Sequence, residues 1–273
     1  MAIYRHRLVT RIGHWINVLC LSLLLLSGLQ IFNAHPRLYW GQSGANADPA
    51  LMEMGAVDGP GNTVLGVTRV GPWTFKTTGL FGWSKDRGEM TARGFPAWLT
   101  VPSYQDLATG RRWHFFFAWL LALNGAVYLV HTILSGHLKK DLLLRRDEMR
   151  PRRLARDLWD HLRLKQPVGE AAKRYNPLQK IAYLTVLFIL LPLMLLTGLT
   201  LSPGMDAILP VLLDLFGGRQ SARTIHFVAA NLIVLFVVIH LVEVLISGIW
   251  NEVRSMITGW YVARTEDAAE KTS

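Results

Sequence analysis

The chain has 273 residues, of which 51% are hydrophobic and only 18% are charged. Soluble domains carry about 25% charged residues, so this composition indicates an integral membrane protein. The formal net charge of +10 does not indicate nucleic-acid binding, because basic proteins of that kind are far less apolar. The single cysteine, Cys20, excludes a disulfide framework and any metal site that needs several cysteines.

Four apolar stretches are long enough to cross a bilayer, whose core of about 30 Å takes roughly 20 helical residues. We therefore expect one all-α membrane domain over residues 1–273, a bundle of four helices. The predicted spans are residues 12–34, 113–138, 181–203 and 222–250. The apolar run 207–213 is too short to cross and contains Pro210, so we interpret it as an interfacial turn. The apolar start resembles a signal peptide, but no small-residue cleavage site follows it.

The distribution of Lys and Arg predicts how the bundle is oriented. The loop 137–180 holds thirteen of them, and with the two termini this side of the membrane has nineteen against ten on the other. Because positive residues gather on the cytoplasmic side, the termini and the basic loop (139–180) should be cytoplasmic. Segment 35–112 should then face outward, where its Trp and Phe residues would either dock a partner or form an aromatic belt.

Six of the nine histidines lie in or next to the predicted spans, where ionisable groups are costly and usually functional. They are His14, His114, His131, His137, His226 and His240. His226 and His240 are fourteen residues apart, so they lie within about 40° of one helix face and roughly 21 Å apart along it. His114 matches the depth of His226, and His14 matches that of His240. A single histidine within a membrane often serves only to form a hydrogen bond between helices. The matched depths of two histidine pairs make that interpretation less suitable here.

Two pairs of imidazoles at two depths suit two six-coordinate haems, each held by one histidine from either side. Zinc would need three or four clustered ligands, and the H-E-x-x-H motif is absent. An iron with two histidine ligands has no open position for a substrate. The pattern therefore predicts electron transfer rather than bond chemistry at iron.

Several nearby residues have alternative interpretations. His131 has the right depth to replace His14 as the inner ligand, but it follows His114 by seventeen residues and so points roughly 100° away. His137 is either a propionate or quinone contact or an ordinary interfacial histidine. Glu243, three residues after His240, is either a proton relay to a quinone or a helix-end carboxylate that reaches cytoplasmic water.

Three stretches of the chain resemble the di-haem b-type cytochromes, the family of bacterial cytochrome b561, the cytochrome b subunit of nickel–iron hydrogenases and the gamma subunit of formate dehydrogenase. They are RHRLVTRIGHWINVLCLSLLLLSGLQIF (5–32), GRRWHFFFAWLLALNGAVYLVH (110–131) and RTIHFVAANLIVLFVVIHLVEVLISG (223–248). The resemblance implies two haem b groups, with His14 and His240 as iron ligands of the inner one and His114 and His226 as iron ligands of the outer one. Basic residues at the inner edge would meet the propionates, although such flanks are usual there: Arg5, Arg7, Lys139 and Lys140.

The resemblance also implies a function. Such a protein passes electrons between the quinone pool and an extracytoplasmic redox partner, in a respiratory chain of the bacterial cytoplasmic (inner) membrane. The segment FNAHPRLYWG (32–41) is similar to a subgroup that accompanies periplasmic molybdopterin oxidoreductases rather than hydrogenases. Whether the chain is itself a quinone oxidoreductase stays open.

Three other classes of protein remain. A non-redox membrane anchor would need no paired histidines, and a transporter subunit is expected to carry internal repeats or matching broken helices. Pro192 breaks the third span, but we find no matching break in the others and no repeat. A haem enzyme acting at iron would need an open iron position, which carbon monoxide binding would reveal.

Overall fold

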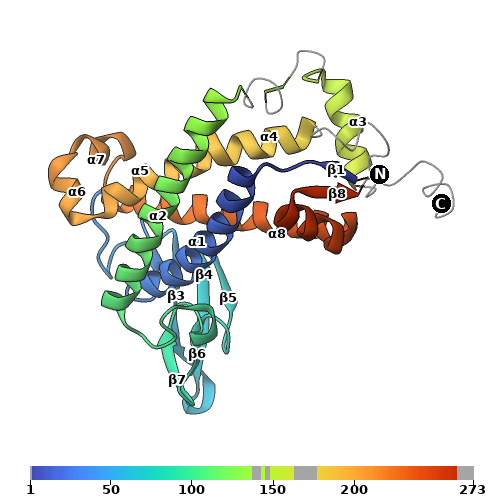
Figure 1. The fold of residues 1–273 in the computed structure, drawn as a ribbon. Helices are drawn as coiled ribbons and strands as arrows, with labels where there is room; N and C mark the ends of the chain where they lie inside the picture. Colours follow the sequence, from blue (N-terminus) through green and yellow to red (C-terminus); the bar gives the residue numbers. More distant parts are fainter. Residues whose placement is uncertain (1, 137–142, 145–147, 163–176, 263–273) are drawn as a thin grey trace. The chain divides into compact units, whose positions relative to one another are not determined.

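Four helices of this chain are long and apolar enough to cross a membrane (Figure 1). The computed structural model describes residues 2–136, 143–144, 148–162 and 177–262, and the count of four helices refers to these residues. The four helical spans are α1 (Leu8–Phe32), α2 (Leu107–Leu134), a third over Pro177–Leu201, and α8 (Arg219–Thr258). The predicted number of apolar membrane helices is thus confirmed.

The helices extend past the apolar stretches that predicted them. Helix α2 begins six residues before the expected position 113, because Asp106 caps it: the Thr109 backbone N–H donates to Asp106 Oδ1 at 3.0 Å. Arg111 and Arg112 end the apolar stretch but not the helix. Helix α8 likewise continues to Thr258. Hydropathy predicts membrane depth, whereas capping groups decide where a helix ends.

Two helices contain local breaks. The third span consists of α4 (Pro177–Thr185), a π-helical turn η5 (Val186–Leu190) and α5 (Leu191–Leu201). Pro192 explains this turn, because a proline inside a helix lacks the N–H donor and its ring crowds the carbonyl four residues earlier. In α8 the break is at Gly248, whose φ of 103° lies outside the helical region.

The segment between α1 and α2 contains most of the β-structure, so the expectation of an all-α chain was wrong there. A four-stranded antiparallel sheet has the order β2-β3-β4-β5, and β6 pairs with β7. The strands are β2 (Arg37–Leu38), β3 (Met52–Asp58), β4 (Val64–Val70), β5 (Trp73–Lys76), β6 (Gly82–Asp86) and β7 (Glu89–Arg93). Short 3-10 turns lie at η1 (Pro60–Asn62) and η2 (Ala97–Leu99). The β3–β4 turn needs positive φ at Gly61 and Asn62, which Gly and Asn tolerate best.

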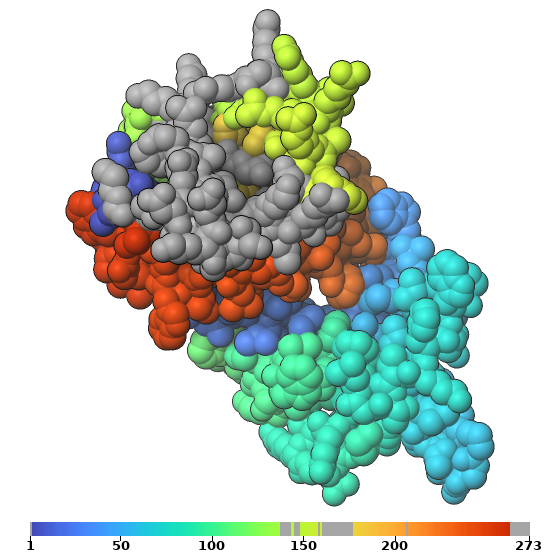
Figure 2. Space-filling view, turned by 90° about the vertical axis from the view of Figure 1, so that its right-hand side faces the viewer, coloured from blue at the N-terminus to red at the C-terminus, as the bar shows by residue number. Residues whose placement is uncertain are grey.

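The β-strands pack on the end of α1 through a small apolar core. Phe32, Leu38, Met54 and Phe95 are buried together, with Phe227 of α8 stacked on Phe32 at 4.9 Å between ring centres. Strands β4 and β6 lie close together because Gly66 and Gly82 have no side chains: a Cβ at either would collide with the opposing backbone. In Figure 2 this region is the cyan-to-green surface.

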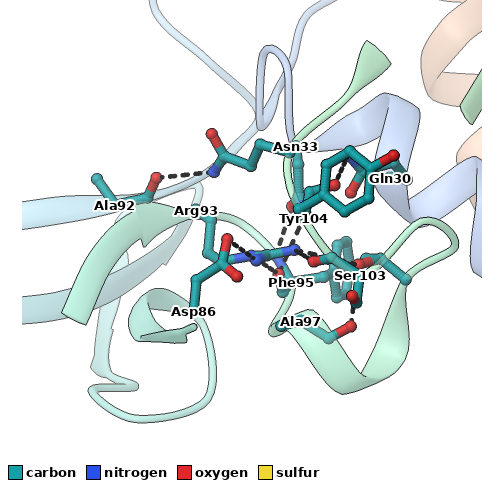
Figure 3. Close-up of polar contacts among 11 residues, drawn as sticks. Gln30, Asn33, Asp86, Ala92, Arg93, Phe95, Ala97, Ser103 and Tyr104 are labelled. Atoms are coloured by element: carbon teal, nitrogen blue, oxygen red, sulfur yellow. Dashed lines mark hydrogen bonds and ion pairs between the residues drawn. The ribbon is translucent and has the colours of Figure 1, made fainter. Parts of the chain in front are cut away.

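A buried arginine fixes the segment that leads from β7 into α2 (Figure 3). The Arg93 side chain is fully buried and pairs with Asp86 at 2.7 Å. It also donates to the carbonyls of Phe95 (2.7 Å) and Ser103 (3.1 Å) and to Thr100 Oγ1 (3.1 Å). Asn33, near the end of α1, bonds both backbone groups of Phe95. Burial lowers the pKa of Arg93, yet these acceptors keep the cation satisfied.

The remaining elements are short. They are α3 (Pro151–Leu162), α6 (Pro203–Ile208), α7 (Val211–Phe216), and the strands β1 (Ala2–Tyr4) and β8 (Trp260–Val262). Strands β1 and β8 pair with each other, so they join the two ends of the described chain. The run 207–213, expected as an interfacial turn, includes the end of α6, Pro210 and the start of α7.

The chain divides into two compact units. The first unit comprises Met1–Asn17, Leu123–Pro192 and Asn231–Ser273. The second unit comprises Val18–Ala122 and Leu193–Ala230, and therefore includes the β-region. Each unit contains a part of every one of the four helical spans.

Candidate functional site

Two histidines of the second unit, His114 in α2 and His226 in α8, form a close pair with ring centres 6.2 Å apart. We call them the outer pair, after the depth that the sequence predicts for them. Each lies seven residues, about two turns, after the first residue of its helix. The sequence predicted that these two histidines lie at the same depth, and the structure places their rings next to each other.

A hydroxyl group contacts each ring of the outer pair. Ser27 Oγ lies 3.1 Å from His114 Nδ1, and Thr197 Oγ1 lies 2.9 Å from His226 Nδ1. Both hydroxyl side chains are completely buried. Each imidazole is therefore held through Nδ1, which leaves Nε2 as the nitrogen available to a metal.

A glycine next to each hydroxyl makes room for the ring. A Cβ placed on Gly28 would lie 3.2 Å from His114 Cε1, and one on Gly198 would lie 3.5 Å from His226 Cε1. Carbon atoms pack best at about 3.5–4.0 Å, so the Gly28 position is already too tight for a methyl group without movement. Glycine at these positions lets a helix backbone lie against each imidazole.

The second pair lies in the first unit. His14 of α1 and His240 of α8 have ring centres 6.3 Å apart, and we call them the inner pair. Phe236 stacks on His240 with an angle of 12° between the ring planes, and Trp15 meets His14 edge-on. Among the described residues, no hydrogen bond holds either ring of the inner pair. The two pairs thus share their spacing but differ in their surroundings.

Polar contacts fix the part of α1 that carries His14. Asn124 of α2 donates to the Gly13 carbonyl at 3.0 Å and to Asn17 Oδ1 at 2.8 Å. These residues lie on either side of His14 in the sequence. Side-chain hydrogen bonds of this kind join helices within membranes. They define the rotation of α1 at the inner pair.

The N-terminal flank is also ordered. Arg5 pairs with Glu252 at 3.8 Å and lies over the Tyr261 ring at 4.8 Å, so it already has partners within the protein. Burial, assisted by the positive charge of Arg5, lowers the pKa of His6 to about 4. His6 is therefore neutral at pH 7.

The spacing of both pairs fits one metal ion between two imidazoles. Metal–imidazole bonds are about 2.0–2.1 Å long and the ring centre lies about 1.1 Å further, so two rings on opposite sides of one metal have centres roughly 6.3 Å apart. The observed separations are 6.2 and 6.3 Å. Over the described ranges, no group of three or more His, Cys, Asp or Glu could hold a metal. A metal whose other ligands come from a cofactor, as in haem, fits a pair of histidines.

The other predicted site residues lie apart from these pairs. His131 is half-buried in the last turn of α2, and in the described part of the chain its ring contacts no other histidine. Glu243 is half-buried in α8, three residues after His240. His137, Lys139 and Lys140 lie outside the described residues.

Ser27 and Thr197 were not assigned a role from the sequence. A signal was present, because Ser27 lies in LLLLSGL (23–29) and Thr197 in LMLLTGL (193–199), two nearly identical segments. No longer repeat surrounds them, and only the tertiary contacts show that each segment meets a histidine. The same contacts show why a glycine follows Thr197: Gly198 lies against the His226 ring.

Four membrane-length apolar helices with paired imidazoles are the features of a multi-pass integral membrane protein that binds haem. The chain belongs to the prokaryotic cytochrome b561 family, whose family model matches residues 5–259. Membership of this cytochrome family implies a membrane protein that carries haem b. The resemblance seen in the sequence is thereby confirmed at the level of the family.

One curated relative is similar over about half of this chain. It is the putative protein-methionine-sulfoxide reductase subunit YedZ1 of Azospira oryzae, 35% identical over 133 residues. These residues cover 49% of this chain and 63% of the relative. No solved structure matches.

Proposed function

We propose that the chain is a di-haem cytochrome b that carries electrons across the cytoplasmic membrane of a bacterium. His14 and His240 would hold the inner haem b, and His114 and His226 the outer one. The observation that carries the proposal is the ring spacing of the two pairs, 6.3 and 6.2 Å, at which one iron fits between each pair. When bound, the haems supply reversible one-electron oxidation and reduction.

With two histidines on each iron, no coordination position would be left for a substrate. The aromatic rings around the inner pair and the buried hydroxyls around the outer pair support this assignment, since they pack against the imidazoles. The protein would hold both irons rigidly and keep water away. Electron transfer between partners on the two faces is the reaction that this arrangement serves.

On the inner side we propose a quinone or quinol as the exchangeable substrate. The termini and the basic loop would face the cytoplasm, as the distribution of Lys and Arg predicts. Glu243 would pass protons between the quinone and cytoplasmic water, because it lies on α8 close in sequence to His240. The alternative is that Glu243 only reaches cytoplasmic water and has no part in the reaction; the expected helix-end position is wrong, because α8 continues to Thr258.

On the outer side we propose a periplasmic redox partner, a molybdopterin oxidoreductase rather than a hydrogenase. The relative's name, a reductase subunit, supports an oxidoreductase partner. Exposed aromatic side chains of the β-region are available for docking: Trp73, Phe75 and Trp98 are 67%, 53% and 72% exposed. Aromatic residues are enriched where proteins bind one another.

The test follows haem reduction by a quinol. Membranes that contain the protein are mixed with a reduced quinone analogue, and the absorbance change of haem b is recorded. We expect rapid haem reduction in wild type and a slower rate in Glu243→Gln, with an unchanged haem content. Haem that a strong chemical reductant reduces but a quinol does not would contradict the quinone proposal.

Carbon monoxide separates the proposal from its main rivals. A six-coordinate haem does not bind it, so the reduced spectrum should not change. A spectral shift would indicate an open iron position and an enzyme acting at haem. A purified protein without haem would indicate a non-redox anchor or a transporter subunit.

A further inference from the structure

Two short segments meet the outer pair in the same way, although they lie on different helices. Residues 23–29 of α1 read LLLLSGL, and residues 193–199 of α5 read LMLLTGL. In each, the hydroxyl residue contacts a histidine Nδ1 and the following glycine lies against the same ring. The two imidazoles of the outer pair thus have matching surroundings.

Each hydroxyl also bonds its own helix. Ser27 Oγ donates to the Leu23 carbonyl at 2.6 Å, and Thr197 Oγ1 donates to the Leu193 carbonyl at 2.6 Å. A hydroxyl has one hydrogen, and this short bond uses it. The hydroxyl oxygen can therefore only accept a hydrogen bond from the imidazole Nδ1–H. His114 and His226 must carry their proton on Nδ1, which leaves a lone pair on Nε2.

This arrangement has an electronic consequence for a metal on Nε2. An imidazole whose Nδ1–H donates to an oxygen is a more basic ligand. A more basic ligand favours the ferric form of an iron and so lowers its reduction potential. Neither ring of the inner pair has such a bond among the described residues, and His240 instead faces the ring of Phe236.

We propose that Ser27 and Thr197 are positioning residues that fix the Nδ1–H tautomer of His114 and His226 and lower the reduction potential of the outer haem. The inference rests on the proposed function, since it requires a haem at the outer pair. It assigns a role to two residues that contact neither the iron nor a substrate. Within the described ranges of the chain, no hydroxyl group makes such a contact with His14 or His240.

The experiment measures the potential of each haem in purified protein by redox titration, with the low-spin ferric signals recorded by electron paramagnetic resonance. The outer haem is identified as the component missing in His114→Ala. Ser27→Ala and Thr197→Val each remove one hydroxyl. We expect each to raise the potential of the outer haem, to change its ferric signal and to leave the inner haem unchanged. The double variant should show the larger shift.

The chain offers matched controls. Ser22 and Thr200 lie on the same two helices, and their hydroxyls donate to the carbonyl four residues earlier. In the part of the chain that the structure describes, neither hydroxyl bonds a histidine. Ser22→Ala and Thr200→Val should therefore leave both potentials unchanged. The exchange variants Ser27→Thr and Thr197→Ser keep a hydroxyl and should restore the wild-type potential.

The outcomes separate this inference from the function on which it rests. Wild-type protein without haem at the outer pair would overturn both. If the protein holds two haems per chain but the reduction potential of the outer haem is the same without the Ser27 or the Thr197 hydroxyl, the role of these hydroxyls is overturned and the proposed function stands. Ser27→Ala can also displace the His114 ring and so lose haem. In that case Thr197→Val, which preserves the side-chain volume, tests whether loss of a hydroxyl raises the potential of the outer haem.

Discussion

Gly28 shows how a single residue makes room for one ring of the outer pair. Because a Cβ at this position would lie 3.2 Å from His114 Cε1, a larger side chain must push the imidazole aside. We expect Gly28→Val to displace His114 and to lower the haem content toward one haem per chain. The pyridine haemochrome assay on purified protein measures this loss.

Gly125 provides the control for that substitution. It also lies in an apolar helix, but a Cβ there would meet no atom within 4 Å. Gly125→Val should therefore keep the wild-type haem content. Equal haem losses in the two variants would show that the effect comes from altered helix packing rather than from contact with His114.

Asp106 gives the start of α2 a pH dependence. Hydrogen bonds from Thr109 hold the pKa of Asp106 below its ordinary value of about 3.9. The carboxylate is favoured in the folded protein, so its stabilisation is complete above the ordinary pKa and is lost as the pH falls through the lower folded value. We expect Asp106→Ala to lower the unfolding temperature at pH 7, and the difference from wild type to shrink near pH 3.

Asp106→Asn is the companion variant, because asparagine caps helices well and does not titrate. It should unfold near the wild-type temperature at pH 7, and its advantage over Asp106→Ala should not depend on pH. An Asp106→Ala difference that does not depend on pH would contradict the capping role of the carboxylate. Thermal unfolding in detergent, followed by circular dichroism, measures all three proteins.

At the scale of elements, Arg93 connects β7 with the segment that leads into α2. Removal of one partner of a buried ion pair costs about 3–5 kcal/mol, because the other charge is left without compensation. Arg93→Met would leave Asp86 and several buried acceptors unpaired. We expect β6 and β7 to open more often, which hydrogen exchange of their amides would detect as faster exchange.

Arg69 is the matched control on the neighbouring sheet. It pairs with Glu53, but its side chain is 49% exposed, and exposed pairs contribute at most about 1 kcal/mol. Arg69→Met should therefore leave amide exchange in β6 and β7 near the wild-type rate. If both variants exchanged equally fast, the network around Arg93 would not be what holds this hairpin.

The helices could be predicted from the sequence, but most of the β-structure could not. A span of about 20 apolar residues is a local signal, and each of the four produced a helix. Strands β3 and β4 are seven residues each and contain Gly55 and Gly66, which weaken the alternating pattern. Their pairing also depends on the turn at Gly61, which was not predicted from the sequence.

The candidate site divides in the same way. Helical periodicity predicted that His226 and His240 share a face, because both lie on one helix. The contact of Ser27 with His114 joins residues 87 positions apart, and no local pattern predicts it. The candidate histidines could therefore be predicted from the sequence, whereas the groups that hold their rings required the tertiary structure.

At the scale of the whole molecule, the charge distribution predicts cytoplasmic termini. A test starts from Cys20→Ser, which removes the single cysteine. In this background we expect Lys76→Cys, in strand β5, to react with a membrane-impermeant maleimide in intact spheroplasts. Arg152→Cys, in α3, should react only after lysis. Both positions are exposed in the structure, and the reverse labelling pattern would contradict the orientation.

The most direct test of the central claim is a reduced-minus-oxidised spectrum with haem stoichiometry, recorded on wild type and on single alanine variants of five histidines. They are His14, His114, His131, His226 and His240. We expect two b haems per chain in wild type, loss of one haem from each variant of the inner or outer pair, and no loss from His131→Ala. Loss at His131 with His14 spared would contradict the inner pair, and a wild-type protein without haem would contradict the account as a whole.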